Sequence, residues 1–418
     1  MMKYPITPDY LQHVPDKLIK LYLDLEEDII RKICESLAIN GEPNATALEL
    51  IRELQRRGMP LDEIQKRITQ TLKISQKELT KALSDAAARN NSYYGTMFDA
   101  LGIVQEEAQT DAMLAEVEAI TRQTQEALQN ITQSLGFGMR NLGGNVVISD
   151  VQQTYQKILD KAEMRVLSSD CSYQVAIRDG VREMANSGLI GEWVEYQDEN
   201  GNVYHRNRVD VAVRRAVMTG VTQISGKYTE MAAEDLETDL FEVSAHKGAR
   251  DVDGPNGWEN HKAWQGKVYS TRNNSKYPNI YKATGLGAVD GLEGANCRHR
   301  RFPFVEGFSE RTYTDEELKN IDPPEFTYKG KKYSAYEATQ RQRQIETALR
   351  KVKRRLVAYK ASGDTDAYQA DAVRYQALTA EYKQFSKAAG LPLQLDQRAT
   401  IPQFGPKEAK EALKAANG

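Results

Sequence analysis

Residues 16–33 read DKLIKLYLDLEEDIIRKI, and this pattern indicates the class of fold to which the chain belongs. Apolar residues recur at spacings of three and four from Leu18 to Ile33, whereas Glu26, Glu27 and other charged residues fill most of the opposite side. Such a period is typical of an amphipathic α-helix with one buried stripe. We therefore expect a helix from residue 16, with its charged side in solvent.

The helical pattern continues through the rest of the N-terminal region. A breaker at residues 40–43, Asn-Gly-Glu-Pro, separates the first helix from the next. Ser75 is expected to begin a helix of its own, because Glu78 follows it at the spacing of a capping box. Glycines at 136–138 and 143–144 are expected to break the chain. The other helices that periodicity predicts lie at residues 45–57, 61–72, 111–135, 151–166 and 173–187.

After Gly188 the pattern changes to short strands and loops. Residues 192–196 and 202–206 favour β-structure, and Asp-Glu-Asn-Gly at 198–201 between them is a hairpin signal. A helix over 210–233 and a strand over 239–245 should follow. From His246 to Pro303 the chain is rich in Gly, Asn, His and aromatic residues with little periodicity, which predicts a compact, loop-rich region.

The C-terminal part returns to helix. A small hairpin is expected at 328–333, and helices at 335–362 and 364–389 should form an antiparallel pair around Gly363. The last residues, rich in Lys and Ala, are expected to fray. The predicted fold class is α+β and mostly helical. Its predicted parts are a helical N-terminal region at 1–188, a central α+β domain at 189–310 and a C-terminal helical region at 311–418.

Composition limits what the chain can do. Hydrophobic residues make up 40% and charged residues 28% of its 418 residues, which is enough apolar material for a packed core. The formal net charge of -3 shows that the chain is not basic overall. Any binding of nucleic acid would therefore need a local patch of basic residues. The chain shows neither a secretory signal nor an apolar run near the roughly 20 residues that span a bilayer. We expect a soluble protein made in the cytoplasm, with no membrane partner.

Three cysteines are too few and too scattered for a disulfide framework. Cys34 and Cys171 fall in helical patterns and are expected to be small core residues. Cys297 differs, because His246, His261 and His299 provide zinc-binding side chains in the same region. Their spacing matches no standard zinc motif, so the cluster is either a buried hydrogen-bonded group, a structural metal site or a catalytic one.

A nucleophilic cysteine needs a nearby histidine, which Cys297 has, but no catalytic signature accompanies it. We therefore predict no catalytic residues, no enzyme and no required cofactor, with structural zinc as an open alternative. Two basic stretches carry a second open question, since each is either a solvated surface or a salt-sensitive contact with nucleic-acid phosphates. The residues in question are Arg298, Arg300 and Arg301, and on the C-terminal helix Lys351, Lys353, Arg354 and Arg355.

Five blocks, in this order, resemble the family called phage minor capsid protein 2. They are DVAVRRAVMTGV from 210, FEVSAHKGAR from 241, HKAWQGKVYS from 261, YPNIYKATGLG from 277 and GANCRHRRFPF from 294. The segments around VPDKLIKLYLDLEEDI, SYQVAIRDGVREMANSGL and QRQRQIETALRKVKRRLVAYK are similar to the same family. A looser likeness to Mu F-type head morphogenesis proteins maps onto His246, Arg250, His261 and Cys297-Arg298-His299.

The resemblance implies a role rather than a reaction. It implies a minor structural protein of a tailed-bacteriophage head, present in several copies per virion and acting in head assembly at or inside the capsid near the portal. Its implied partners are the portal protein, the major capsid protein or both, and packaged DNA is a further candidate. Two alternatives remain open at this point: a DNA-associated internal protein ejected with the genome, and a nuclease or transferase that uses the His/Cys cluster.

Overall fold

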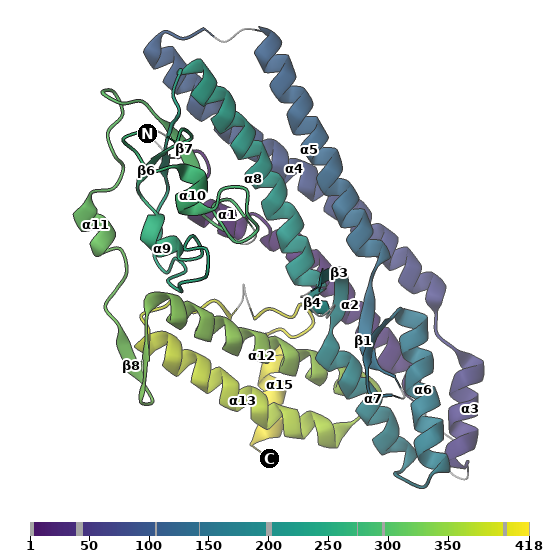
Figure 1. Ribbon diagram of the computed structural model, residues 1–418. Helices are drawn as coiled ribbons and strands as arrows, with labels where there is room; N and C mark the ends of the chain where they lie inside the picture. Colours follow the sequence, from purple (N-terminus) through teal and green to yellow (C-terminus); the bar gives the residue numbers. More distant parts are fainter. Residues whose placement is uncertain are drawn as a thin grey trace. The chain divides into compact units, whose positions relative to one another are not determined.

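The computed structural model describes residues 4–38, 45–104, 107–141, 143–197, 203–273, 275–294, 297–395 and 399–417 (Figure 1). The fold is α+β and mostly helical, as predicted. Among the described residues, no helix is both long enough and apolar enough to cross a lipid bilayer. The predicted breaker at 40–43 and the predicted turn at 198–201 lie outside the described residues.

The chain divides into two compact units, each assembled from three distant segments. Unit 1 comprises Met1–Lys17, Gln76–Ala127 and Arg214–Arg341, and unit 2 comprises Leu18–Ser75, Leu128–Val213 and Gln342–Gly418. These boundaries differ from the predicted ones at 188 and 310. The predicted division into three regions stays a prediction. Three long helices of unit 1 and the C-terminal helical pair of unit 2 are easily followed in Figure 1.

Unit 2 contains a four-stranded antiparallel sheet in the order β2-β1-β3-β4. The elements that lie wholly or mainly in this unit are α2 (Asp16–Leu37), α3 (Ala47–Arg57), β1 (Gly136–Arg140), β2 (Val146–Ser149), α6 (Val151–Leu167), α7 (Tyr173–Ser187), β3 (Leu189–Gln197), β4 (Val203–Arg208), α12 (Ala335–Ser362), α13 (Thr365–Ala388) and α15 (Pro406–Ala416). The hairpin of β3 and β4 and the bounds of α2, α6, α7, α12 and α13 agree with the sequence predictions.

The helical run does end at the predicted glycine break, since α5 ends at Gln133, but residues 136–138 form strand β1, which was not predicted. Phe137 pairs with Ser149 across the sheet, and Phe137 and Met139 are fully buried. A Cβ atom at Gly136 would lie 2.6 Å from the Ser149 carbonyl oxygen, so glycine is needed for the two backbones to approach. The glycine that suggests a break therefore serves close strand packing.

Two further expectations for unit 2 are corrected. The C-terminus does not simply fray: Pro406–Ala416 forms α15, which buries Ala412 and pairs Glu411 with Lys360 at 2.6 Å. Cys34 is a buried helical residue as expected, but Cys171 lies half-buried in the connection between α6 and α7. The two antiparallel helices α12 and α13 pack as predicted, with the Tyr382 hydroxyl donating to Glu346 at 3.0 Å.

Unit 1 is built on three long helices and a small sheet of order β6-β5-β7. The elements that lie wholly or mainly in this unit are α1 (Pro8–His13), α4 (Leu61–Leu101), α5 (Glu107–Gln133), α8 (Val209–Asp235), β5 (Leu240–Val243), α9 (His261–Trp264), β6 (Val268–Ser270), α10 (Ile280–Thr284), β7 (Arg301–Phe304), α11 (Asp315–Lys319), β8 (Phe326–Tyr328) and β9 (Lys331–Tyr333). The predicted strand near 239–245, the loop-rich stretch after it and the hairpin at 328–333 are confirmed.

The predicted helix start at Ser75 is wrong, because α4 runs through it without interruption. The Ser75 hydroxyl donates to the Leu72 carbonyl at 2.8 Å, a bond that a serine inside a helix commonly makes. Glu78 does not cap; its carboxylate pairs with Lys17 at 2.6 Å. The buried residues Leu79 and Leu83 then continue the apolar stripe along unit 1. A helix-start motif has thus been overridden by packing.

Helices α4, α5 and α8 pack against one another within unit 1. The Tyr94 hydroxyl on α4 lies 3.0 Å from the Thr229 hydroxyl on α8, and Gln109 on α5 donates to Asp235 at the end of α8. Helices α5 and α8 lie close together at Gly220, where a Cβ atom would lie 2.7 Å from the Thr124 hydroxyl oxygen. This helical layer supports one side of the loop-rich segment that carries the predicted site residues.

Candidate functional site

The structure brings His261, Cys297 and His299 together in unit 1. His261 is the first residue of α9, whose N-terminus is capped by the Asn260 side chain, and the other two residues lie just before β7. The Cys297 sulfur is 3.8 Å from His261 Nδ1 and 3.6 Å from His299 Nδ1. All three side chains are buried, at 4% exposed or less. The predicted cluster is therefore a real three-residue group with both imidazoles directed at one sulfur.

Hydrogen bonds on the far side of each ring set the orientation of both histidines. His261 Nε2 lies 2.9 Å from the Asp290 carbonyl oxygen, and His299 Nε2 lies 3.0 Å from Gln265 Oε1. The same Gln265 oxygen accepts a hydrogen bond from the backbone N–H of His246. The oxygen end of this amide therefore faces the cluster. Both partners are carbonyl oxygens, which can only accept hydrogen bonds. Each Nε2 atom therefore carries the proton of its ring, and each Nδ1 atom directs a lone pair at the sulfur.

The fourth predicted residue, His246, lies beside the group without pointing at the sulfur. Its ring stacks on His299 with centroids 4.4 Å apart and an interplanar angle of 21°. Its Nδ1 lies 2.9 Å from the Lys247 carbonyl oxygen and 3.1 Å from an Arg298 nitrogen. Trp264 packs its edge against His299 from another direction. His246 thus contributes packing around the cluster.

Burial keeps these groups uncharged near neutral pH. Desolvation, followed by the charge of Arg298, lowers the pKa of His246 to about 3, and desolvation lowers the pKa of His261 and of His299. Desolvation also raises the pKa of the Cys297 thiol. A cysteine that acts as a nucleophile normally needs a lowered pKa and some exposure, so this environment favours a structural or ligand role for Cys297.

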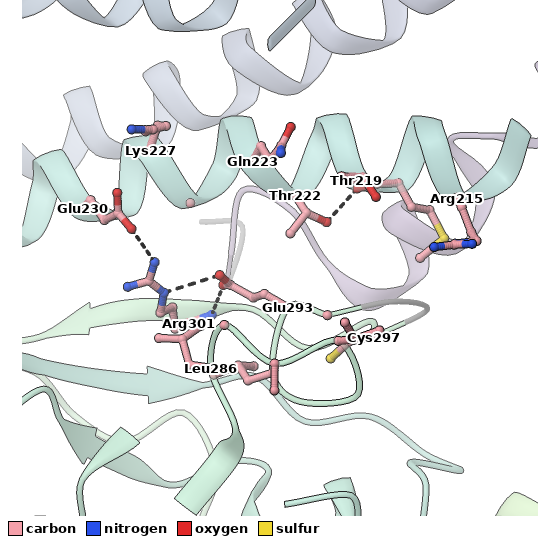
Figure 2. Close-up of a pocket in the computed structure, with 17 residues that line it drawn as sticks. Arg215, Thr219, Thr222, Gln223, Lys227, Glu230, Leu286, Glu293, Cys297 and Arg301 are labelled. Atoms are coloured by element: carbon pink, nitrogen blue, oxygen red, sulfur yellow. Dashed lines mark hydrogen bonds and ion pairs between the residues drawn. The ribbon is translucent and has the colours of Figure 1, made fainter. Parts of the chain in front are cut away.

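The arginines that follow the cluster are already bonded inside unit 1. Arg300 is 1% exposed and donates to the His299 carbonyl oxygen at 2.8 Å and to Thr222. Arg301 is 7% exposed and pairs with Glu230 at 2.7 Å and with Glu293 at 3.4 Å (Figure 2). Arg298 donates to Gln12 at 2.6 Å. A phosphate group would have to displace these partners, and phosphate binding here stays a prediction.

A cavity of about 480 Å³ lies next to the cluster, between α8 and the segment that leads to Cys297 (Figure 2). Arg215, Lys227 and Glu230 of α8 line one side, and Leu286 and Glu293 line the other. Cys297 itself is part of the wall. The cavity therefore provides space beside the sulfur-containing group.

The second basic stretch is not a solvated face. Lys353, Arg354 and Arg355 are 8%, 2% and 7% exposed, and only Lys351 of the four predicted residues is exposed. Lys353 donates to the Ala399 carbonyl oxygen, and Arg355 forms two bonds to Asp371. The expectation of a solvated surface is wrong for these three residues, because acidic and carbonyl oxygens of unit 2 enclose them. Phosphate binding at this stretch also stays a prediction.

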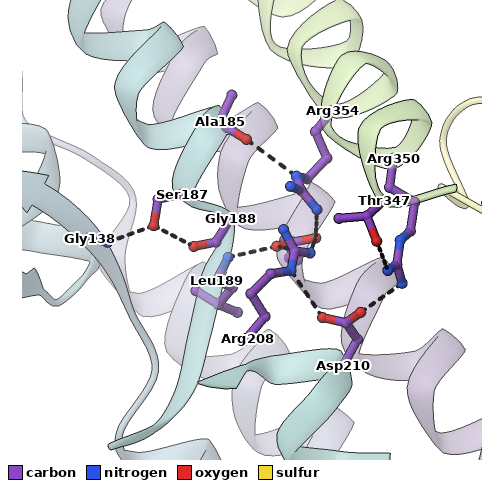
Figure 3. Close-up of polar contacts among 11 residues, drawn as sticks. Gly138, Ala185, Ser187, Gly188, Leu189, Arg208, Asp210, Thr347, Arg350 and Arg354 are labelled. Carbon is purple, nitrogen blue, oxygen red and sulfur yellow. Dashed lines mark hydrogen bonds and ion pairs between the residues drawn. The ribbon is translucent and has the colours of Figure 1, made fainter. Parts of the chain in front are cut away.

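Arg354 belongs to a buried ionic group in unit 2 that sequence reasoning missed (Figure 3). Glu26, predicted on a charged outer face, is fully buried and pairs with Arg354 at 3.5 Å and Arg208 at 3.4 Å. Asp210 pairs with Arg208 at 3.1 Å and with Arg350 at 2.7 Å. Burial opposes ionisation of Asp210, but these two arginines outweigh it and hold the pKa of that carboxyl well below its usual range. The charged residues are structural here.

Comparison with known proteins agrees with the sequence blocks. The family model described as phage minor capsid protein 2 matches residues 6–387. A structural protein of Lactococcus phage LL-H is 25% identical over 362 residues, which are 83% of this chain and 88% of that relative. A structural protein of Lactococcus phage mv4 is 37% identical over 95 residues, which are 23% of this chain and 68% of that relative. No solved structure matches the chain.

Proposed function

Because this chain belongs to the phage minor capsid protein 2 family and is a structural component of a phage virion, we propose that it acts in head assembly, at or inside the capsid near the portal. The proposed partners are the portal protein, the major capsid protein or both. Several copies per particle would suit a minor component. In this proposal the chain works by binding other virion proteins and has no catalytic role.

The extent of the family match carries the proposal. Residues 6–387 include most of unit 1 and most of unit 2, so neither unit is left over as an appended domain with an activity of its own. The LL-H relative, named a structural protein, is also matched along 88% of its length. A chain whose whole length follows a structural family is best explained by a structural role.

The placement of charge favours protein partners over DNA. The residues that motivated a DNA-associated alternative are largely bonded inside the protein: Arg300, Arg301, Lys353, Arg354 and Arg355 are all less than 9% exposed. Binding to nucleic acid depends on cations that can reach phosphates and release counterions. These side chains would first have to break internal bonds, which weakens the case for a protein that coats the genome.

Quantitative mass spectrometry of purified particles, before and after genome ejection, tests the proposal. Several copies in full heads, retained in emptied heads, would support it, and cross-links to the portal protein would support the proposed position. Loss together with the DNA would favour the alternative of an ejected internal protein. Absence from mature particles would overturn a virion role near the portal and would favour a transient assembly factor or an enzyme.

A further inference from the structure

We propose that His261, Cys297 and His299 form a binding site for a zinc-class divalent ion, with two imidazole nitrogens and one thiolate sulfur as protein ligands. These are the His and Cys side chains whose ligand atoms all lie within 4.8 Å of one another among the described residues. The proposal concerns the metal chemistry of unit 1 and does not depend on where the protein sits in a virion.

The distances fit a tetrahedral ion. Zinc binds sulfur at about 2.3 Å and nitrogen at about 2.0–2.1 Å, which separates the two ligand atoms by about 3.6 Å at a tetrahedral angle. In the structure the Cys297 sulfur lies 3.6 Å from His299 Nδ1 and 3.8 Å from His261 Nδ1. The two Nδ1 atoms lie within 4.8 Å of each other, and a tetrahedral ion would bring them to about 3.3 Å.

The count of protons favours a metal over a simple hydrogen-bonded cluster. Each Nδ1 atom is unprotonated and carries a lone pair, because the ring proton is on Nε2. His261 Nε2 donates to the Asp290 carbonyl oxygen, and His299 Nε2 donates to the Gln265 side-chain oxygen. The Cys297 thiol has one proton and can donate to only one of the two nitrogens. The other Nδ1 would face sulfur without a donor in a buried site. A cation bound by the thiolate satisfies both nitrogens at once.

The surroundings resemble the supporting shell of a metal site. A ligating histidine usually donates its other ring nitrogen to an oxygen acceptor, which orients the ring and raises its basicity. Both histidines do so here, and Gln265 is itself held by the His246 backbone N–H at 3.0 Å. The donor set suits a borderline-soft ion and does not suit Mg²⁺ or Ca²⁺, which prefer oxygen.

The proposed site lies beside the cavity, because Cys297 is part of the cavity wall. Bound there, the ion would join the start of α9 to the segment before β7. In a region with few regular elements, this cross-link would be expected to stabilise the folded loops.

The direct test measures zinc in the full-length chain, purified after removal of any histidine tag. We expect about one zinc ion per chain, and at least about a tenfold loss of affinity on removal of a ligand in Cys297→Ser or His299→Asn. Cys34→Ser is the matched control, because Cys34 is also a buried free thiol, and it lies in unit 2. His13→Gln, outside the cluster, controls for loss of a histidine.

Cobalt substitution gives a readout that does not rely on the variants folding. The wild-type chain loaded with Co²⁺ should show the visible absorption of a tetrahedral ion and a thiolate-to-metal charge-transfer band. Zinc should also protect Cys297 from alkylation in the native protein, and a chelator should remove that protection. Zinc bound equally by the wild type and Cys297→Ser, or wild-type protein with neither zinc nor a thiolate–cobalt band, would overturn the proposal.

Discussion

Glu26 and Arg354 form an ion pair inside unit 2, with 3.5 Å between Oε2 and Nη1 and side chains that are 0% and 2% exposed. They stand 328 positions apart in the sequence. Glu26 also accepts from the Leu189 backbone N–H, and Arg354 donates to the Ala185 carbonyl oxygen at 3.3 Å (Figure 3). The pair thus links the first and last segments of unit 2 to the middle one.

Replacing Arg354 by Met should destabilise the protein strongly. Removal of Arg354 leaves the buried Glu26 carboxylate with one arginine partner, Arg208, where it had two. Breaking a buried ion pair in this way typically lowers the free energy of unfolding by about 3–5 kcal/mol. Lys351→Met is the matched control on the same helix, because Lys351 is exposed, and its effect should stay within about 0.5 kcal/mol. Urea unfolding followed by circular dichroism measures both, and similar effects of the two variants would contradict the assigned burial.

Stability should fall as the pH rises from about 5 to 9, owing to Glu27. Burial, then the neighbouring charges of Glu26 and Asp24, raises the pKa of this carboxyl to about 9, although a bond from the Gln403 N–H opposes the shift. The folded chain therefore keeps a proton that the unfolded chain releases near its ordinary pKa. Since the folded state then binds more protons, each increase in pH within this window favours unfolding.

Glu27→Gln should flatten that pH dependence, because the amide cannot ionise in either state. Urea midpoints measured at several pH values test this, and Glu53→Gln is the control because Glu53 is an exposed carboxylate with a surface partner, Arg56. The control substitution should leave the dependence of the urea midpoint on pH unchanged. A wild-type midpoint that stays constant or rises between pH 5 and 9, after correction by the control, would rule out the protonated Glu27.

Two glycines on α8 should respond to alanine in opposite directions. Gly220→Ala places a Cβ atom 2.7 Å from the Thr124 hydroxyl oxygen, which is held by its own bond to Ile120, so overpacking should destabilise by about 1–3 kcal/mol. At Gly226 the nearest atom would be 3.9 Å away, so Gly226→Ala should stabilise the helix by about 0.5–1 kcal/mol. Thermal melting distinguishes them, and the same sign for both would refute the close contact of α5 and α8.

Gln265 should control zinc affinity without being a ligand. Gln265→Leu removes the acceptor for His299 Nε2, so affinity should fall by about 10–100-fold, whereas Gln265→Glu keeps an acceptor oxygen and should retain binding. Competition with a chromogenic chelator gives both affinities. If the Leu and Glu variants bind zinc equally well, the acceptor does not orient His299 for a metal.

Chelation should lower the melting temperature of the wild type, because an ion that binds only the folded state stabilises it by mass action. The effect should disappear in Cys297→Ser and persist in Cys34→Ser, which leaves the three ligands intact. Readdition of zinc should restore the wild-type value. Equal shifts in all three proteins would point to metal bound elsewhere.

Most helices could be predicted because their signals are local. The bounds of α6, α7 and α12 follow from apolar spacing and from capping or breaking residues a few positions away. The errors occurred where packing overrode a local signal: Ser75 stands inside α4, and Gly136 is a strand residue pressed against Ser149. Neither neighbour is visible from a short window of sequence.

The candidate site was only partly predictable. Residue types alone singled out His246, His261, Cys297 and His299, and three of these converge. The acceptors that orient them, the Asp290 carbonyl and the Gln265 side chain, lack any signal in the sequence, because a backbone carbonyl has no residue identity and glutamine is common on surfaces. The protonation pattern that suggests a metal could be read only from the contacts.

Family, fold class and the residues able to bind a metal were all available from the order of the amino acids, because they depend on local patterns and on the side chains themselves. The meaning of the charged residues was not. Glu26 and Arg354 read as members of solvated helix faces, yet they are buried partners. A charge is stable away from water only beside an opposite charge or hydrogen-bonding groups, and folding alone brings such partners together across the chain.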